Sequence, residues 1–131
     1  MKVLALDFGR ARTGVAVSDP TGTIARPLCV VERAGSGDGL ARLAALIGEQ
    51  EVDRVVVGLP LTLRGQRGEQ VQETERFVEA LSDVTDVPVV TFDERFTTSL
   101  AEQTPADTPE DARAAAHLLS SYLAWASGAP A

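Results

Sequence analysis

The N-terminal segment, residues 3–8, has the sequence Val-Leu-Ala-Leu-Asp-Phe, and residues 9–14 continue with Gly-Arg-Ala-Arg-Thr-Gly. A second apolar segment, Val-Ala-Val-Ser-Asp, follows at residues 15–19. Apolar segments this short, bounded by glycines, are typical of buried strands rather than helices. Because a short loop separates the two segments, we predict that they form a β-hairpin around which the rest of the chain is organised.

Asp7 is the unusual residue of this hairpin. A carboxylate within an apolar strand loses solvation, so it needs a metal ion, a cation or several N–H donors as partners. Gly9 follows it and provides the permissive backbone that a sharp exit from the strand requires. Two interpretations remain open for Asp7 alone: it is a metal ligand, or it caps the turn at the strand end.

Length and composition indicate one globular domain. The chain has 131 residues, of which 44% are hydrophobic and 24% are charged, as in ordinary soluble domains. We expect the domain to cover residues 1–126 and residues 127–131 to form a frayed tail. No apolar stretch approaches the length of a membrane span, and the N-terminus has a strand pattern rather than a signal segment. With Cys29 as the one cysteine, most simply a core residue, these features favour a cytoplasmic protein.

The charge distribution limits how this chain could contact nucleic acid. The formal net charge of −7 argues against wrapping nucleic acid by bulk electrostatics, but it allows a local basic patch beside an acidic metal site. The arginines that fall in predicted loops are Arg10, Arg12, Arg64, Arg67 and Arg95.

Hydrophobic periodicity predicts the remaining elements. The predicted strands after the hairpin are an edge strand over residues 23–33 and strands over 52–58 and 87–92. The predicted helices are one capped by Asp38, one over 67–82, a short one that residues 97–103 could form, and one over 109–126. The inner face of the 67–82 helix is expected to carry Val71, Thr74, Val78 and Leu81, and that of the last helix Ala115, Leu118, Leu119 and Tyr122. The order β-β-β-α-β-α-β-α indicates an α/β fold with a mixed sheet and helices on both faces.

Acidic residues fall where separate elements end or begin. Asp7 closes the first strand, Asp93 and Glu94 follow the last strand, and Asp111 lies in the first turn of the last helix. Sites in open α/β sheets form at the carboxyl ends of the strands, where neighbouring loops diverge. If these strands are parallel neighbours, Asp7 and the Asp93–Glu94 pair lie at the same edge of the sheet.

Asp111 has two interpretations. It shares the core-facing stripe of Ala115, Leu118 and Tyr122, so it could point toward a strand end. However, residues 108–111 read Thr-Pro-Glu-Asp, which is also a helix start with an N-cap, a first-turn proline and acids favoured by the helix dipole. Spacing alone favours capping over ligation.

Clustered carboxylates repel one another unless a cation joins them, and their hard oxygen atoms suit Mg²⁺ or Mn²⁺. Two such ions ~4 Å apart stabilise both the attacking and the leaving oxygen in phosphodiester cleavage. Arg10, Arg12 and Arg95 could position phosphates, or they could pair with surplus surface acids. Thr97, Thr98 and Ser99 could contact phosphate through their hydroxyls, or cap a helix.

Four motifs in order resemble one known family. They are Leu6-Asp7-Phe8-Gly9 with Gly14-Val15-Ala16-Val17-Ser18-Asp19, Val57-Gly58-Leu59-Pro60-Leu61 with Gly65, Asp93-Glu94-Arg95 with Thr98 and Ala101, and Asp111 with Ala114, Ala115, Leu119 and Tyr122. Together they resemble the YqgF/RuvX family of RNase H-like nucleases over nearly the whole chain.

The resemblance implies an RNase H-like fold with a five-stranded mixed sheet in the order 3-2-1-4-5. It implies a bacterial cytoplasmic nuclease that processes the 5′ end of precursor 16S rRNA, with Holliday junction resolution as the alternative activity. The family's catalytic and metal-binding acids fall on Asp7, Glu94 and Asp111, and Arg10, Arg12, Arg95 and Thr98 become candidate contacts to nucleic acid.

Two departures concern substrate contact rather than chemistry. The family usually has Gly-Thr-Lys in the first loop, whereas this chain has Gly9-Arg10-Ala11, so Arg10 or Arg12 must replace the lysine. The stretch before the last acid is usually longer and carries glycines and lysines, whereas residues 104–110 are short and acidic.

Other functions remain possible on the sequence alone. The Asp-x-Gly hairpin also resembles the phosphate loop of the sugar kinase and actin superfamily, but 131 residues leave no room for the two domains that ATP handling needs there. A non-catalytic RNA-binding assembly factor is the other alternative, favoured by the acidic net charge. We expect a monomer or a homodimer, and no membrane association.

Overall fold

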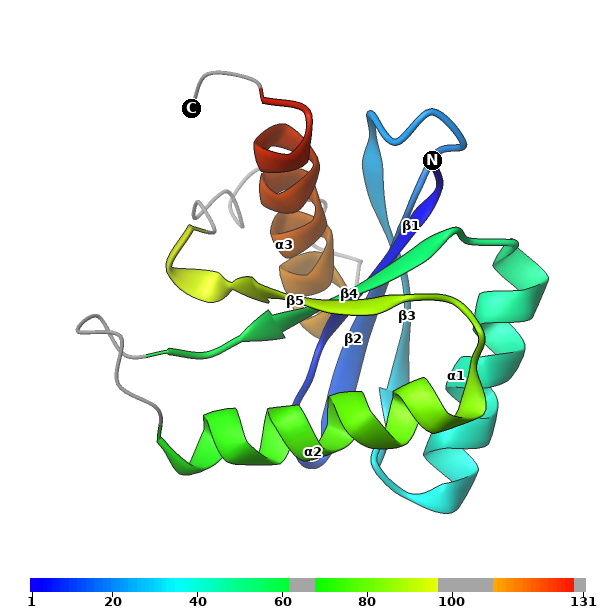
Figure 1. Cartoon of the computed structure of the whole chain (residues 1–131), viewed down its shortest axis with the longest axis vertical. Helices are drawn as coiled ribbons and strands as arrows, with labels where there is room; N and C mark the ends of the chain where they lie inside the picture. Colours follow the sequence, from blue (N-terminus) through cyan, green and yellow to red (C-terminus); the bar gives the residue numbers. More distant parts are fainter. Residues whose placement is uncertain (62–67, 97–109, 129–131) are drawn as a thin grey trace.

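The computed structural model describes residues 1–61, 68–96 and 110–128, in which helices cover both faces of a five-stranded sheet (Figure 1). In chain order the elements are β1 (Val3–Asp7), β2 (Arg12–Ser18), β3 (Ala25–Glu32), α1 (Gly37–Gln50), β4 (Arg54–Leu59), α2 (Glu69–Val84), β5 (Val89–Asp93), the 3₁₀ turn η1 (Glu94–Phe96) and α3 (Glu110–Ala126). The element order predicted from the hydrophobic pattern is confirmed.

The strands are arranged in the order β3-β2-β1-β4-β5, which confirms the predicted topology. β2 is antiparallel to both β1 and β3, whereas β4 is parallel to both β1 and β5. β1 is therefore the central strand, and the carboxyl ends of β1, β4 and β5 lie at the same edge of the sheet. This edge is where sites form in open α/β sheets.

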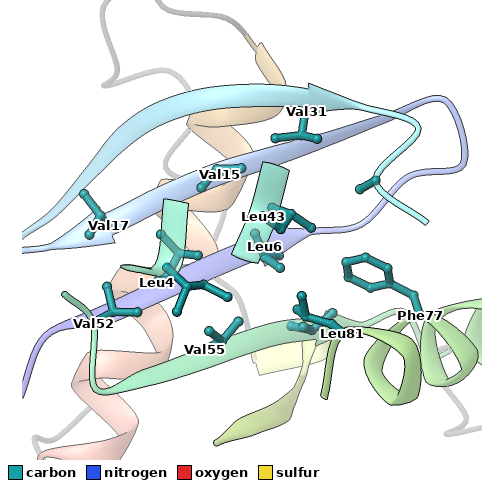
Figure 2. Close-up of a cluster of buried hydrophobic side chains, with 13 residues drawn as sticks. Leu4, Leu6, Val15, Val17, Val31, Leu43, Val52, Val55, Phe77 and Leu81 are labelled. Carbon is teal, nitrogen blue, oxygen red and sulfur yellow. The ribbon is translucent and has the colours of Figure 1, made fainter. Parts of the chain in front are cut away.

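Strand β1 is buried on both faces because helices cover the sheet from both sides. Leu4 and Leu6 belong to a cluster with side chains of α1 and α2, part of which Figure 2 shows. Val3 and Ala5 belong to the cluster on the opposite face, which α3 covers. Side chains alternate along a strand, so Asp7 lies on the face that α3 covers.

Two local predictions were wrong. The N-cap of α1 is Ser36, whose hydroxyl accepts a hydrogen bond from the Gly39 amide at 3.1 Å, whereas Asp38 lies in the first turn, where the helix dipole favours an acid. On the inner face of α2, the buried position predicted for Val78 belongs to Phe77, because the Phe77 ring stacks on the ring of Phe8.

Cys29 is half-buried at the margin of the cluster on the α1 and α2 face. The inner face predicted for the last helix is confirmed, since Ala115, Leu118, Leu119 and Tyr122 of α3 are all buried. The short helix predicted over 97–103 and the predicted Thr108 cap lie outside the described residues. In the part of the chain that the structure describes, no helix is both long and apolar enough to cross a membrane.

Candidate active site

The carboxyl groups of Asp7 and Glu94 meet at the edge of the sheet where β1 and β5 end. Asp7 is the last residue of β1, and Glu94 begins the turn η1 directly after β5. Both residues are half-buried, and their side chains share a hydrogen bond. The parallel arrangement of β1, β4 and β5 brings these two acids together although 86 residues lie between them in the sequence.

The shared environment of these two carboxyl groups raises both of their pKa values. Burial is the largest cause of the raised pKa of Glu94, to about 7, and the hydrogen bond to Asp7 and the charges of Asp7 and Asp93 add to it. Burial also raises the pKa of Asp7, helped by the charge of Asp111 and opposed by the hydrogen bond to Glu94. The pair therefore retains a proton near neutral pH unless a cation replaces it.

The raised pKa values of this pair predict that the metal-free protein loses stability as the pH rises. The pKa of Glu94 is about 7 in the folded chain and returns to its ordinary value near 4.5 on unfolding, so unfolding releases a proton between these values. The stabilisation is fully present below pH ~4.5 and is lost as the pH rises through ~7. We expect the melting temperature in EDTA to fall over this window and expect Glu94→Gln to flatten the fall. An equal slope in the variant would contradict this assignment.

Asp111 lies beside this pair but faces a different partner. Its carboxylate, 38% exposed, is 3.2 Å from Nε of Arg12, and its charge acts on Asp7. Within residues 1–61, 68–96 and 110–128, no three carboxylate, imidazole or thiol side chains are gathered closely enough to hold a metal ion as they stand. The structure therefore joins two of the three acids and leaves the third ion-paired to an arginine.

A cavity of about 530 Å³ opens beside the Asp7–Glu94 pair. Its lining comes from β1, the loop after β1 and one face of α2, and includes Arg10, Gln70, Glu73 and Thr74. Sequence reasoning missed the contribution of α2. The spacing of Gln70, Glu73 and Thr74, which places them on one side of a helix, was the signal available.

Each of the candidate phosphate-binding arginines in the described residues pairs with a carboxylate. Arg10 contacts both oxygens of Glu73 on α2, with Nε 3.3 Å from Oε2. Arg12 pairs with Asp111, and Nε of Arg95 lies 2.9 Å from Oδ2 of Asp93. Thr98 lies outside the described residues. The alternative that these arginines pair with acids therefore describes their state in this structure.

Comparisons with known proteins place these features in a family. The family model RuvX, described as Holliday junction resolvase, matches residues 1–125. A protein of Chloroflexus aggregans, provisionally named a pre-16S rRNA nuclease, is 44% identical over 130 residues and the match covers 92% of each chain. A relative of the same provisional name from Chloroflexus aurantiacus is 46% identical over 101 residues, 77% of this chain and 66% of its own length, which is just under two thirds.

Among solved structures, RuvC of T. thermophilus in complex with a Holliday junction substrate superimposes with a TM-score of 0.68. The sequence identity is 18%, and the match covers 98% of this chain and 97% of that chain. A likeness at this level of identity shows a shared fold.

Proposed function

This chain belongs to the RuvX family, and from that premise we propose that it is a nuclease that hydrolyses phosphodiester bonds with divalent metal ions bound at its acidic site. The family description and the names of the relatives support a nuclease. The metal requirement rests on the carboxylates themselves, and Mg²⁺ or Mn²⁺ suits their oxygen atoms.

The observation that carries this proposal is the half-buried Asp7–Glu94 pair at the margin of the cavity. Two carboxyl groups in contact can both be ionised only if a cation lies between or beside them. Asp7 and Glu94 would hold such an ion, and Asp111, which already acts on Asp7 through its charge, is the third candidate ligand. A bound ion would supply an activated water and stabilise charge on the phosphate oxygens.

The protein's own side chains would orient the phosphate. Arg10 stands at the cavity with its guanidinium held by Glu73, and Arg12 stands beside Asp111. A guanidinium presents several donors in a fixed fork that matches phosphate oxygens. We infer that Arg10 or Arg12 replaces the lysine that the first loop lacks, and that Arg95 and Thr98 are further contacts to the nucleic acid.

Arg10→Ala is expected to weaken substrate binding and to leave the fold intact, because the Arg10 side chain is 79% exposed. Loss of one phosphate contact should reduce the slope of log affinity against log salt by about 1. Binding to a non-cleavable substrate at several salt concentrations measures this slope. Arg26, exposed on β3 and paired in register with Val17 at the far end of β2, provides the control, since Arg26→Ala should leave the slope unchanged.

Structured RNA is the substrate that we propose first, because the relatives carry the name of pre-16S rRNA nucleases. A four-way DNA junction is the second candidate, from the description of the family model. The test compares cleavage of an rRNA precursor leader, single-stranded DNA and a four-way junction, each with Mn²⁺ and with EDTA. Preferred cutting of the leader that EDTA abolishes is expected, whereas preferred cutting of the junction would support the second candidate.

A non-catalytic RNA-binding assembly factor remains the alternative from another class. It predicts that the protein binds the leader but cuts none of the three substrates, and that Mn²⁺ does not raise its melting temperature. Metal-dependent stabilisation together with cleavage would exclude it, because mass action raises stability when an ion binds the folded state.

A further inference from the structure

Glu94 has to pass across a strand to reach Asp7. In the sheet, β4 lies between β1 and β5, so the acid that follows β5 and the acid that ends β1 are on either side of β4. Gly58 of β4 pairs in register with Phe92 of β5, and its neighbour Val57 pairs with Leu6 of β1. Gly58 is therefore level with Asp7, one position beyond the Leu6–Val57 pair.

The side chain of Glu94 fills the space that a side chain on Gly58 would need. A Cβ atom built on Gly58 would lie 2.7 Å from Oε1, 2.9 Å from Cγ and 3.1 Å from Cδ of Glu94. Distances below 3.0 Å are not compatible with a real methyl group, so one of the two side chains would have to move. Because the backbone of β4 is held between two strands, the side chain that moves is the more flexible Glu94.

We propose that Gly58 is a positioning residue for the acidic site. Because glycine has no side chain, it leaves open the space through which the Glu94 carboxylate reaches Asp7. This role rests on the proposed metal-dependent function: metal affinity would depend on Gly58 although Gly58 is not itself a metal ligand. Side chains alternate along β4, and Val56, which lies on the face that α3 covers, places Gly58 on that same face.

Gly14 shows the same device on the other side of β1. It pairs in register with Asp7, and a Cβ atom on it would meet the backbone of Asp111. The two strands that flank β1 thus both carry a glycine level with Asp7, and each glycine makes room for one of the other two acids. Gly58 is the more informative position to test, because a side chain rather than a backbone fills its space.

The test is Gly58→Ala, measured by Mn²⁺ titration and by thermal unfolding in EDTA. We expect the variant to fold and its Mn²⁺ dissociation constant to rise about 10–100-fold, the range found when residues that orient metal ligands are altered. Gly48→Ala on α1 is the matched control, because nothing lies within 4 Å of the Cβ atom it would add.

A double-mutant cycle distinguishes action through Glu94 from general damage. Gly58→Ala should destabilise the metal-free wild type but should have no further effect on stability or on Mn²⁺ affinity in a Glu94→Ala background, where the obstructed side chain is gone. Equal effects in both backgrounds would overturn the inference, and so would wild-type Mn²⁺ affinity in Gly58→Ala. If the wild type itself binds no Mn²⁺ and cuts nothing, the proposed function fails instead, while the stability cycle still tests the steric contact.

Discussion

Asp7→Asn is expected to abolish metal-dependent cleavage and to leave the metal-free protein folded. An amide has almost the shape of a carboxyl group but carries no charge, so the variant loses a candidate metal ligand without creating a cavity. Altering residues that merely orient ligands costs 10–100-fold, so removal of the central ligand should reduce kcat by at least ~100-fold.

Stability should move in the opposite direction from activity in this variant. Burial raises the pKa of Asp7, which means that its ionised form is disfavoured in the folded chain. Asp7→Asn removes this unfavourable charge, so at pH ~8 in EDTA the variant should melt at a temperature equal to or above that of the wild type. Its Mn²⁺-induced stabilisation should be lost.

The matched control for this result is Asp53→Asn. Asp53 accepts a hydrogen bond from the backbone amide of Lys2 at 2.9 Å, at the end of the sheet where β1 begins, so it lies far from the acidic pair. An asparagine can keep that acceptor, and cleavage should continue at the wild-type rate. Cleavage by Asp7→Asn at a rate equal to that of the control would show that Asp7 is not the metal ligand proposed here.

Gly14→Ala is expected to produce the largest loss of stability. A Cβ atom on Gly14 would lie 1.8 Å from the carbonyl oxygen and 2.3 Å from the carbonyl carbon of Asp111, at the start of α3. These atoms belong to the backbone, so the whole first turn of α3 would have to move away from β2. Overpacking inside a core costs about 1–3 kcal/mol and occasionally more, and we expect the upper end of this range or beyond.

Urea unfolding of Gly14→Ala and of the Gly48→Ala control measures this effect. The control should be neutral or slightly stabilising, because alanine is favoured over glycine in a helix by about 0.5–1 kcal/mol. A Gly14→Ala protein as stable as the wild type would mean that α3 does not approach β2 as closely as described.

The fold could be predicted from the sequence because its signals are local. Short apolar segments indicated the strands, and helical stripes such as Ala115, Leu118 and Tyr122 indicated the inner faces of the helices. The less accurate predictions concern competition between neighbours, as between Phe77 and Val78 for the buried position on α2. The ring of Phe8, which decides that competition, is distant in the sequence.

The candidate site could be predicted in part for the same reason. The acids at the ends of the first and last strands were expected to meet, because parallel strands end at the same edge of the sheet. The structure places Asp7 and Glu94 in contact. The roles of Asp7, Glu94 and Asp111 as metal ligands stay predictions. The positions of the arginines in the sequence also could not show that they are paired with acids, because for Arg10 and Arg12 the acid belongs to a different element.

The sequence by itself therefore determined which elements form, which face of each is apolar, and which acids stand at the strand ends, since all of these follow from periodicity and end signals within a few residues. The tertiary structure alone decided which groups share space. It pairs Arg10 with Glu73 and Arg12 with Asp111. It also aligns Gly14 and Gly58 with Asp7, so that other parts of the chain fill the space that their side chains would need. The reason is that burial, charge pairing and steric room are properties of neighbours that are distant in sequence, and no local pattern records them.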